Sequence, residues 1–182
     1  LEKLIQKEMQ DMGFLDTQFA FQFQKKKEIT EKGFDEVECF VSLNPGEPLR
    51  ALREVGSGGE LSRIMLSIKT VLADTDAVPT LIFDEIDTGI SGRTAEKVGE
   101  KLQKIAAKHQ VILITHLPQI AAKADRHFLI EKNVVDGKTK TEIHALSEEE
   151  SVEELARLLG GEDLTEEALQ NARSLKKKAE RK

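Results

Sequence analysis

The chain has 182 residues, of which 39% are hydrophobic and 33% are charged, and its formal net charge is −6. This composition is typical of a folded globular protein with a charged surface and excludes an intrinsically disordered chain. The negative net charge gives no sign of nucleic-acid binding through overall charge, the single cysteine excludes an internal disulfide, and no apolar stretch reaches the length that a membrane span needs, so we expect no membrane partner.

Residues 1–13 predict a helix, and residues 17–24 and 36–43 predict two strands. Apolar residues recur at helical spacing until Gly13, and this helix is expected to be the end of a longer one. Each strand segment alternates between two faces. The residues expected to share one face are Phe19, Phe21 and Phe23 in the first strand, and Val37, Cys39, Val41 and Leu43, pointing inward, in the second.

The middle of the chain alternates between helix-periodic and continuously apolar segments. A helix is expected at residues 61–72, after a glycine-rich loop at 55–59, and a second helix at 91–110. Residues 80–83 and 111–115 are short apolar runs, typical of strands buried on both faces. The apolar helix positions are Leu61, Ile64, Met65, Ile68, Val71 and Leu72 in the first helix, and Ala95, Val98, Leu102 and Ile105 in the second.

The last third of the chain predicts a short helix at residues 117–124, strands at 126–132 and 141–146, and two further helices. The first of these two helices is expected to start with a capping box, in which Ser151 is the N-cap and Glu154 is the third helical residue.

This order of elements predicts an α/β fold with a mostly parallel sheet flanked by helices, because buried strands joined by a crossover helix pair in parallel. The N-terminal strands are expected to form an additional antiparallel piece. The chain has no internal repeat and no low-complexity linker, so we expect residues 1–182 to form a single domain.

Two acidic residues follow the apolar run at residues 80–83, at the strand end where open α/β sheets gather their ligands. Asp84 is suited to hold Mg²⁺, directly or through water, because Mg²⁺ takes few carboxylates and keeps several waters. Glu85 would point the other way and could orient or deprotonate an attacking water. The alternative is a polar strand end that enters a turn, and these two residues alone leave both interpretations open.

A histidine, His116, follows the second apolar run. If the two strands are neighbours, His116 lies at the same sheet edge as Glu85 and could contact a γ-phosphate and the attacking water. The alternative is a solvent-facing histidine at a strand end.

The glycine-rich loop suits an anion at the start of a helix. Gly58 and Gly59 let the backbone approach an anion closely, and Ser57 can donate a hydroxyl hydrogen bond. The alternative is a helix N-cap with a flexible entry. The sequence contains no G-x-x-x-x-G-K-[ST] pattern, so this loop is not a phosphate-binding P-loop.

Taken in order, these segments resemble the signature motif, Walker B strand, D-loop and switch histidine of an ABC-type ATPase head. NPGEPL before the glycine loop and ELSR after it resemble the SMC-like branch of these heads. DEIDTGISG and THLPQIAAKADRHF resemble the RecN family of bacterial DNA repair proteins. The resemblance covers essentially the whole chain, as the C-terminal lobe of a head, and implies that residues 1–13 are the end of a coiled-coil helix.

The resemblance implies roles for nine residues at an interface between two heads. The signature loop would cap the γ-phosphate of ATP that is bound to the P-loop of the facing head, which explains why this loop needs no lysine. The roles are signature contact for Ser57, Gly58, Gly59 and Glu60, metal binding for Asp84, catalysis for Glu85 and His116, and D-loop contact for Asp87 and Ser91. Two positions depart from the pattern: Gly56 stands where the signature usually has leucine, and Ser91 where the D-loop commonly has aspartate.

The function that the resemblance implies is ATP hydrolysis in DNA double-strand break repair and recombination. Its cofactors would be ATP and Mg²⁺, neither held tightly by this segment alone. Its partners would be the N-terminal head lobe, a second head in a homodimer, and DNA ends or single-stranded regions, in a cytoplasmic, nucleoid-associated protein. Two alternatives are a head fragment of another SMC-like ATPase and an interaction module of the same fold without catalysis.

Overall fold

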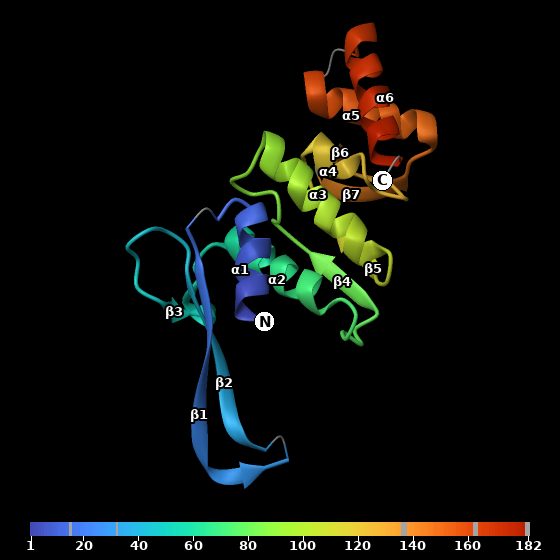
Figure 1. Cartoon of the computed structure of the whole chain (residues 1–182). Helices are drawn as coiled ribbons and strands as arrows, with labels where there is room; N and C mark the ends of the chain where they lie inside the picture. The colour runs from blue at the N-terminus through green and yellow to red at the C-terminus, as the bar shows by residue number, and fades with distance from the viewer. Residues whose placement is uncertain (15, 32, 136–137, 162–163, 181–182) are drawn as a thin grey trace. The chain divides into compact units, whose positions relative to one another are not determined.

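The computed structural model describes residues 1–14, 16–31, 33–135, 138–161 and 164–180 (Figure 1). The chain divides into two compact units, Leu1–Ile114 and Thr115–Lys182. Each unit is described by itself below. Within the described residues, no helix combines the length and the apolar character that crossing a membrane requires.

The first unit begins with a helix and a small antiparallel sheet. Helix α1 spans Glu2–Asp11, and the strands β1 (Gln18–Thr30), β2 (Gly33–Ser42) and β3 (Arg50–Ala51) lie side by side in that order. Both strand pairs are antiparallel, which confirms the expected N-terminal antiparallel piece. A 3-10 helix, Leu52–Glu54, then leads to the glycine-rich loop.

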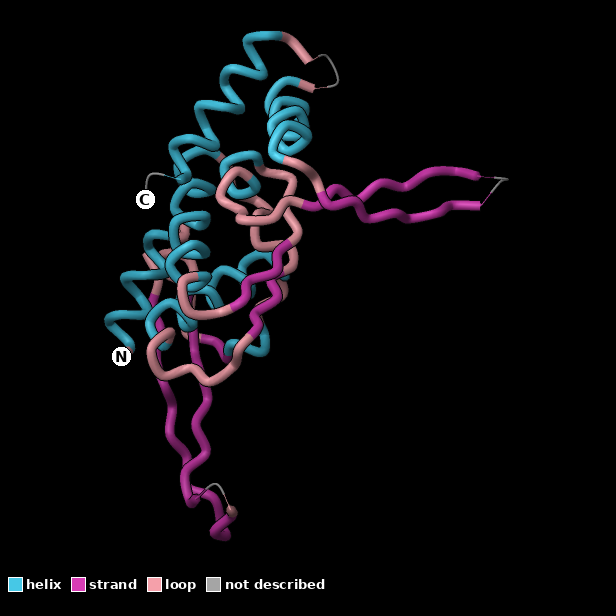
Figure 2. The backbone as a smooth tube through the Cα atoms, turned by 90° about the vertical axis from the view of Figure 1, so that its right-hand side faces the viewer, coloured by secondary structure: helices cyan, strands magenta, loops and turns pink. Residues whose placement is uncertain are grey.

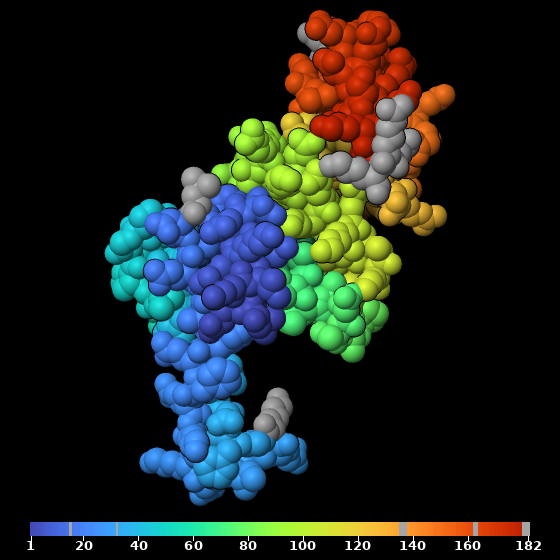
Figure 3. Space-filling model, viewed as in Figure 1, coloured from blue at the N-terminus to red at the C-terminus, as the bar shows by residue number. Residues whose placement is uncertain are grey.

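The β1–β2 hairpin is buried at its base and exposed along its outer half. Phe19 and Val41, which face each other across the hairpin, are 2% and 0% exposed, whereas Phe23 and its partner Val37 are 69% and 52% exposed. Figures 2 and 3 show this hairpin extending beyond the helices of its unit. The prediction that Val37 points into the core is therefore wrong, because the strand continues past the elements that cover its base.

The α/β core of this unit consists of two helices and two strands: α2 (Gly58–Leu72), β4 (Thr80–Phe83), α3 (Gly92–Ala106) and β5 (Gln110–Leu113). β4 and β5 pair in parallel, from Thr80 opposite Gln110 to Phe83 opposite Leu113. The strand–helix–strand prediction is confirmed. Among the described residues, parallel pairing is confined to these two strands.

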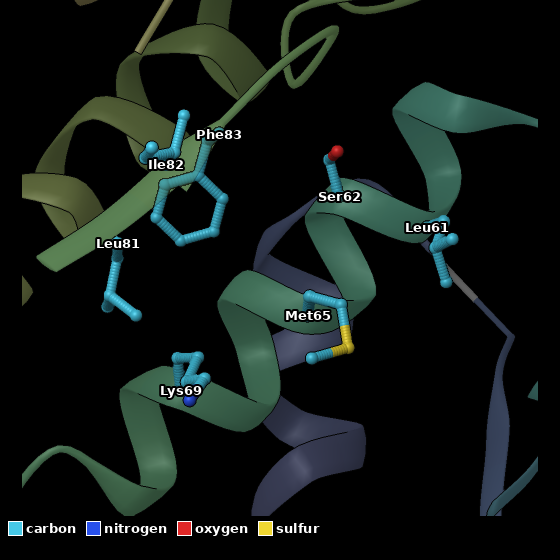
Figure 4. Close-up of a pocket in the computed structure, with 7 residues that line it drawn as sticks. All are labelled: Leu61, Ser62, Met65, Lys69, Leu81, Ile82 and Phe83. Atoms are coloured by element: carbon cyan, nitrogen blue, oxygen red, sulfur yellow. The ribbon is translucent and has the colours of Figure 1, made fainter. Parts of the chain in front are cut away.

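Strand β4 is buried on one face only. Leu81 and Phe83 are 8% and 6% exposed and extend toward α2 (Figure 4). Ile82 extends to the opposite side and is 72% exposed. The prediction that this strand is buried on both faces is therefore wrong for the face that carries Ile82.

The two core helices differ in how well their apolar pattern predicts burial. In α3, all four expected positions (Ala95, Val98, Leu102 and Ile105) are buried, as predicted. In α2, Leu61 is 37% exposed, and polar residues take part of the buried face. Ser67 and Thr70 are tolerated there because their hydroxyls donate to the carbonyls of Arg63 and Leu66, at 2.9 and 2.7 Å, so neither hydroxyl hydrogen is left unbonded.

The second unit contains a short helix, a hairpin and two longer helices. They are α4 (Pro118–Ala121), β6 (Phe128–Val135), β7 (Lys138–Ala145), α5 (Glu148–Gly160) and α6 (Glu166–Glu180). β6 and β7 pair antiparallel. A small core joins α4, α5 and α6, and its buried residues are Ala121, Ala122, Leu155, Ala156, Ala168 and Ala172.

Helix α5 begins one turn earlier than predicted. Its N-cap is Ser147, whose hydroxyl accepts the Glu150 N–H while the Glu150 carboxylate accepts the Ser147 N–H. The capping box is therefore Ser147 with Glu150, and the prediction of Ser151 with Glu154 is wrong. Both pairs have the same spacing, and Ser151 is instead buried with its hydroxyl 3.0 Å from Nδ1 of His127.

Candidate functional site

The candidate site lies at the carboxyl end of β4, where Asp84 and Glu85 follow the strand directly. The parallel ladder continues to this point, because the N–H of Ile114 donates to the carbonyl of Phe83 at 3.3 Å. Asp84 is exposed, and its Oδ1 accepts the N–H of Glu85 at 2.9 Å. The carboxylate pair is therefore accessible at the sheet edge where the sequence analysis expects it.

Glu85 has an unusual backbone conformation. Its φ of 56° is the only positive φ of a non-glycine residue among the described residues. This left-handed conformation costs roughly 1–2 kcal/mol for a residue with a Cβ, so the surrounding contacts must stabilise it. One such contact closes the turn after Glu85, whose carbonyl accepts the N–H of Thr88 at 3.0 Å. The strain therefore falls on the residue that the sequence analysis singles out as a catalytic base.

The first turn of α2 packs directly onto this loop. Ser57 is the N-cap, and its hydroxyl accepts the N–H of Glu60 at 3.4 Å. A Cβ added to Gly58 would overlap Oε2 of Glu85, and one added to Gly59 would stand 2.9 Å from the Glu85 carbonyl oxygen and 2.9 Å from Cβ of Thr88. The two glycines therefore permit a close approach within the same chain, between the glycine-rich loop and the β4–α3 loop.

Two residues that the sequence analysis did not assign, Ser62 and Arg63, also connect α2 to this loop. The Ser62 hydroxyl donates to the carbonyl of Asp84 at 2.7 Å. Nη1 of Arg63 donates to the carbonyls of Thr88 at 2.7 Å and Ile86 at 3.4 Å. The sequence does contain a signal for Arg63, because this arginine stands among the apolar residues of an amphipathic helix. A charged residue on the buried face of a helix needs a specific partner, so Arg63 could have been predicted to have one.

Arg63 is buried and only 7% exposed. Its guanidinium lies over the ring of Phe14, 5.4 Å from the ring centre, in a cation–π arrangement. Burial lowers the pKa of Arg63 below its ordinary value, and the charge of Glu60 opposes this effect. The guanidinium of Arg63 thus loses most of its contact with water on folding and bonds instead to the carbonyls of the loop that follows Glu85.

The two predicted D-loop residues differ in their surroundings. Asp87 is 4% exposed, and its carbonyl accepts the N–H of Ile90 at 3.4 Å. Ser91 is exposed at the start of α3, and its hydroxyl makes no capping hydrogen bond. Asp87 thus contributes to the loop from inside it, whereas the Ser91 side chain is accessible.

His116 is the second residue of the second unit, and it is exposed. It follows Thr115, whose hydroxyl accepts the N–H of Leu117 at 3.1 Å. The proximity of His116 to Glu85 stays a prediction. Of the predicted site residues, the structure brings Gly58, Gly59, Asp84 and Glu85 together within the first unit.

The donor set is compatible with Mg²⁺ bound mainly by a nucleotide. No group of three or more histidine, cysteine, aspartate or glutamate side chains that suits a metal occurs among the described residues. Mg²⁺ in nucleotide sites takes one or two carboxylates and fills its remaining positions with phosphate oxygens and water. The exposed Asp84 carboxylate satisfies that modest requirement.

A small pocket of about 260 Å³ lies beside the site, between α2 and β4 (Figure 4). Its lining residues are Leu61, Ser62, Met65, Lys69, Leu81, Ile82 and Phe83. The lining is mostly apolar, and Lys69 is already paired with Asp76 at 2.5 Å. The pocket therefore offers little to a phosphate group.

Comparison with solved structures identifies the fold. The Smc head domain with a coiled coil and joint from Pyrococcus yayanosii matches with a TM-score of 0.59 at 20% identity, covering 85% of this chain and 28% of that one. The Smc head domain with an extended coiled coil from Pyrococcus furiosus, solved with the C-terminal domain of ScpA, matches with a TM-score of 0.51 at 20% identity, covering 79% and 34%. The chain thus has the fold of part of an Smc head domain.

Comparison with curated sequences narrows this class. The DNA repair protein RecN of Halalkalibacterium halodurans is 44% identical over 179 residues, which are 96% of this chain and 32% of the relative. RecN of Vibrio cholerae is 43% identical over 176 residues, with the same shares, and RecN of Bacillus subtilis is 46% identical over 153 residues, 84% and 27%. No protein-family profile matches the chain. The chain is a RecN-like segment, and it spans about a third of the length of the curated relatives it matches.

Proposed function

We propose that this segment supplies one half of an ATP hydrolysis site in a RecN-like DNA repair ATPase. The observation that carries the proposal is the accessible pair Asp84 and Glu85 at the end of β4, packed against the glycine-rich start of α2. Phosphoryl transfer needs positioning and charge stabilisation more than covalent chemistry from the protein. A preorganised carboxylate beside a helix N-terminus suits that task, because the helix N-terminus favours anions.

Each residue has a distinct role in this proposal. Asp84 holds Mg²⁺, directly or through water, and the ion neutralises phosphate charge when it is bound. Glu85 orients and deprotonates the attacking water, and His116 contacts the γ-phosphate and that water. Asp87 and Ser91 form the D-loop contact across the interface between heads.

The glycine-rich loop serves a second nucleotide. Ser57, Gly58, Gly59 and Glu60 cap the γ-phosphate of ATP held by the P-loop of a facing head. The partners are therefore the N-terminal lobe of the same protein, a second head in a homodimer, and DNA near double-strand breaks. Hydrolysis releases the two heads, and the protein acts on DNA in the cytoplasm at the nucleoid.

The substitution Glu85→Gln in the full-length protein tests this function. Glutamine keeps the shape of the side chain but accepts no proton, so ATP binding should persist while turnover falls by roughly a hundredfold to ten-thousandfold. ATP-bound, associated heads should accumulate. The control is Glu153→Gln, which removes an exposed carboxylate of α5 and should leave turnover unchanged. Near-normal turnover in Glu85→Gln would show that Glu85 is not the base, and no turnover in the unmodified protein would favour a catalytically silent module.

The segment alone should neither bind ATP tightly nor hydrolyse it. Its 182 residues contain no P-loop, so no lysine and backbone cradle grip the β- and γ-phosphates. Calorimetric titration of the segment with Mg·ATP measures this directly. An affinity in the micromolar range would contradict the assignment of the glycine-rich loop to a nucleotide on another head.

A further inference from the structure

The first two turns of α2 hold the β4–α3 loop through a set of contacts that we name the α2 latch. It consists of the Ser62 hydroxyl, which donates to the carbonyl of Asp84, and the Arg63 guanidinium, which donates to the carbonyls of Ile86 and Thr88. Its acceptors are the carbonyls of the residues on either side of Glu85, Asp84 and Ile86, and the carbonyl of Thr88. The latch therefore bonds to the backbone on both sides of Glu85.

Arg63 is suited to this task because its guanidinium is planar and presents several donors in a fixed arrangement. A single nitrogen, Nη1, reaches two carbonyls of the loop, and the guanidinium carbon lies over the Phe14 ring. The side chain is 7% exposed, so water does not compete strongly for these bonds. A buried cation held between an aromatic ring and two carbonyls has little freedom to move.

The latch also explains how the strained conformation of Glu85 persists. A φ of 56° is unfavourable for glutamate, and the peptide groups on both sides of the residue would rotate to relieve it if they were free. Ser62 bonds the carbonyl of the peptide before Glu85, the Thr88 N–H bonds the carbonyl of the peptide after it, and Arg63 bonds the carbonyl of the next peptide, at Ile86. Gly59 packs against the Glu85 carbonyl from the same helix.

We propose that Arg63, with Ser62, is a positioning residue that orients Glu85 for hydrolysis and joins the glycine-rich loop to the Glu85 loop as one rigid body. This inference rests on the proposed function. When the nucleotide of a facing head binds to Ser57 and Gly58, the resulting shift of the glycine-rich loop also shifts Glu85, because the start of α2 joins the two loops rigidly. The loop that senses one nucleotide and the carboxylate that acts on the other cannot move independently.

The first test measures amide hydrogen exchange in the nucleotide-free, full-length protein. Arg63→Met keeps the length and the contact with Phe14 but removes every donor, so the N–H groups of Glu85 and Thr88 should exchange about tenfold faster or more. Arg63→Lys keeps the charge and one compact donor group, and should give an intermediate rate. Ser62→Ala is a milder variant that should speed exchange at Glu85 in a protein that remains folded.

The matched control is Lys101→Met, which removes another largely buried cation of the same unit. Lys101 pairs with Glu8 at 2.5 Å and Asp11 at 2.9 Å, neither of which belongs to the latch. It should lower overall stability without selectively exposing the Glu85 and Thr88 amides. Unchanged exchange at these two amides in both Arg63→Met and Ser62→Ala would overturn the inference.

The second test separates positioning from general destabilisation by kinetics. In the full-length protein, Arg63→Met should lower kcat by roughly tenfold to a hundredfold with KM for ATP nearly unchanged, because misplacement of a catalytic group costs rate rather than ground-state binding. Arg63→Lys should restore part of kcat. In a Glu85→Gln background, Arg63→Met should cause no further loss, since the group that it positions is already absent.

The two proposals fail in different ways. If Glu85→Gln leaves turnover intact, the proposed function is wrong, whatever Arg63 does. If Glu85→Gln lowers turnover as expected but Arg63→Met leaves kcat unchanged, or lowers it equally in both backgrounds, then only the positioning role of Arg63 is wrong.

Discussion

The carboxylate of Glu85 lies against the backbone of Gly58, so closely that a Cβ on Gly58 would overlap Oε2 of Glu85. The residue proposed to act on one nucleotide thus packs on the loop proposed to face another. This relationship and the neighbouring contact of Gly59 lead to different expectations for the two glycines.

Alanine substitutions at Gly58 and Gly59 should separate function from stability. Gly59→Ala places a methyl group 2.9 Å from the Glu85 carbonyl oxygen and from Cβ of Thr88, and overpacking of this kind costs about 1–3 kcal/mol. Gly58→Ala meets mainly the end of a flexible side chain, so stability should change little while turnover falls because Glu85 is displaced. Denaturant unfolding and ATP turnover of the full-length protein measure the two effects.

The control for this pair is Gly56→Ala, because nothing lies within 4 Å of a Cβ at Gly56. Its stability should be unchanged or slightly higher, since alanine reduces the freedom of the unfolded chain. A Gly59→Ala protein as stable as Gly56→Ala would mean that the loop relaxes easily, and the close approach would then not be required.

Ser57→Arg should separate nucleotide binding from head engagement. Arginine is too large for a loop that is meant to abut a phosphate, but the altered surface faces the partner head. ATP affinity of the full-length protein should therefore stay near normal, while ATP-driven head association and hydrolysis are both lost. Fluorescent-nucleotide binding and light scattering measure these properties side by side.

The control for Ser57→Arg is Ser57→Thr, which retains a hydroxyl that can cap α2 as Ser57 does. It should preserve binding, association and hydrolysis. Loss of nucleotide binding by an isolated, unassociated Ser57→Arg head would show that the loop serves its own nucleotide.

Stability of the second unit should fall as the pH drops below about 6.5, the ordinary pKa of histidine. Burial lowers the pKa of His127, an effect partly opposed by Glu154 and reinforced by Lys176. The unfolded chain therefore binds a proton at a higher pH than the folded one, so stability is complete above the unfolded pKa and is lost as the pH falls toward the folded pKa.

Thermal unfolding of the protein between pH 8 and pH 5 checks this expectation. His127→Asn keeps a polar group near the Ser151 hydroxyl, which lies 3.0 Å from Nδ1 of His127, and removes the titration. The substituted protein should lose less stability over this interval than the unmodified protein. Equal pH dependence in both would show that His127 does not control the effect.

Ser147→Ala should destabilise α5 by about 1 kcal/mol, because it removes the hydroxyl that accepts the Glu150 N–H. Ser174→Ala, at an exposed position inside α6, should be neutral or slightly stabilising. Thermal unfolding at neutral pH distinguishes the two. If Ser147→Ala has no effect, the helix does not depend on the cap at that residue.

Local sequence patterns determined the order of the helices and strands and the fold class of this protein. Glycine, proline and the spacing of apolar residues predicted the order of helices and strands, and the buried positions of α3 agree with that spacing. The α/β class follows from the same alternation. The Asp84–Glu85 pair could be assigned to a strand end because both residues directly follow the apolar run of β4, so no long-range information was needed.

Features that depend on neighbours distant in sequence were decided only by the tertiary structure. Two consecutive S-x-x-E motifs could each start α5, and because the helix starts at Ser147, Ser151 packs beside His127, 24 residues away. Ile82 is exposed because burial depends on what covers a face, which apolar character does not specify. Arg63 bonds to carbonyls 23 and 25 residues further along the chain, and a backbone carbonyl has no residue type that a sequence pattern could reveal.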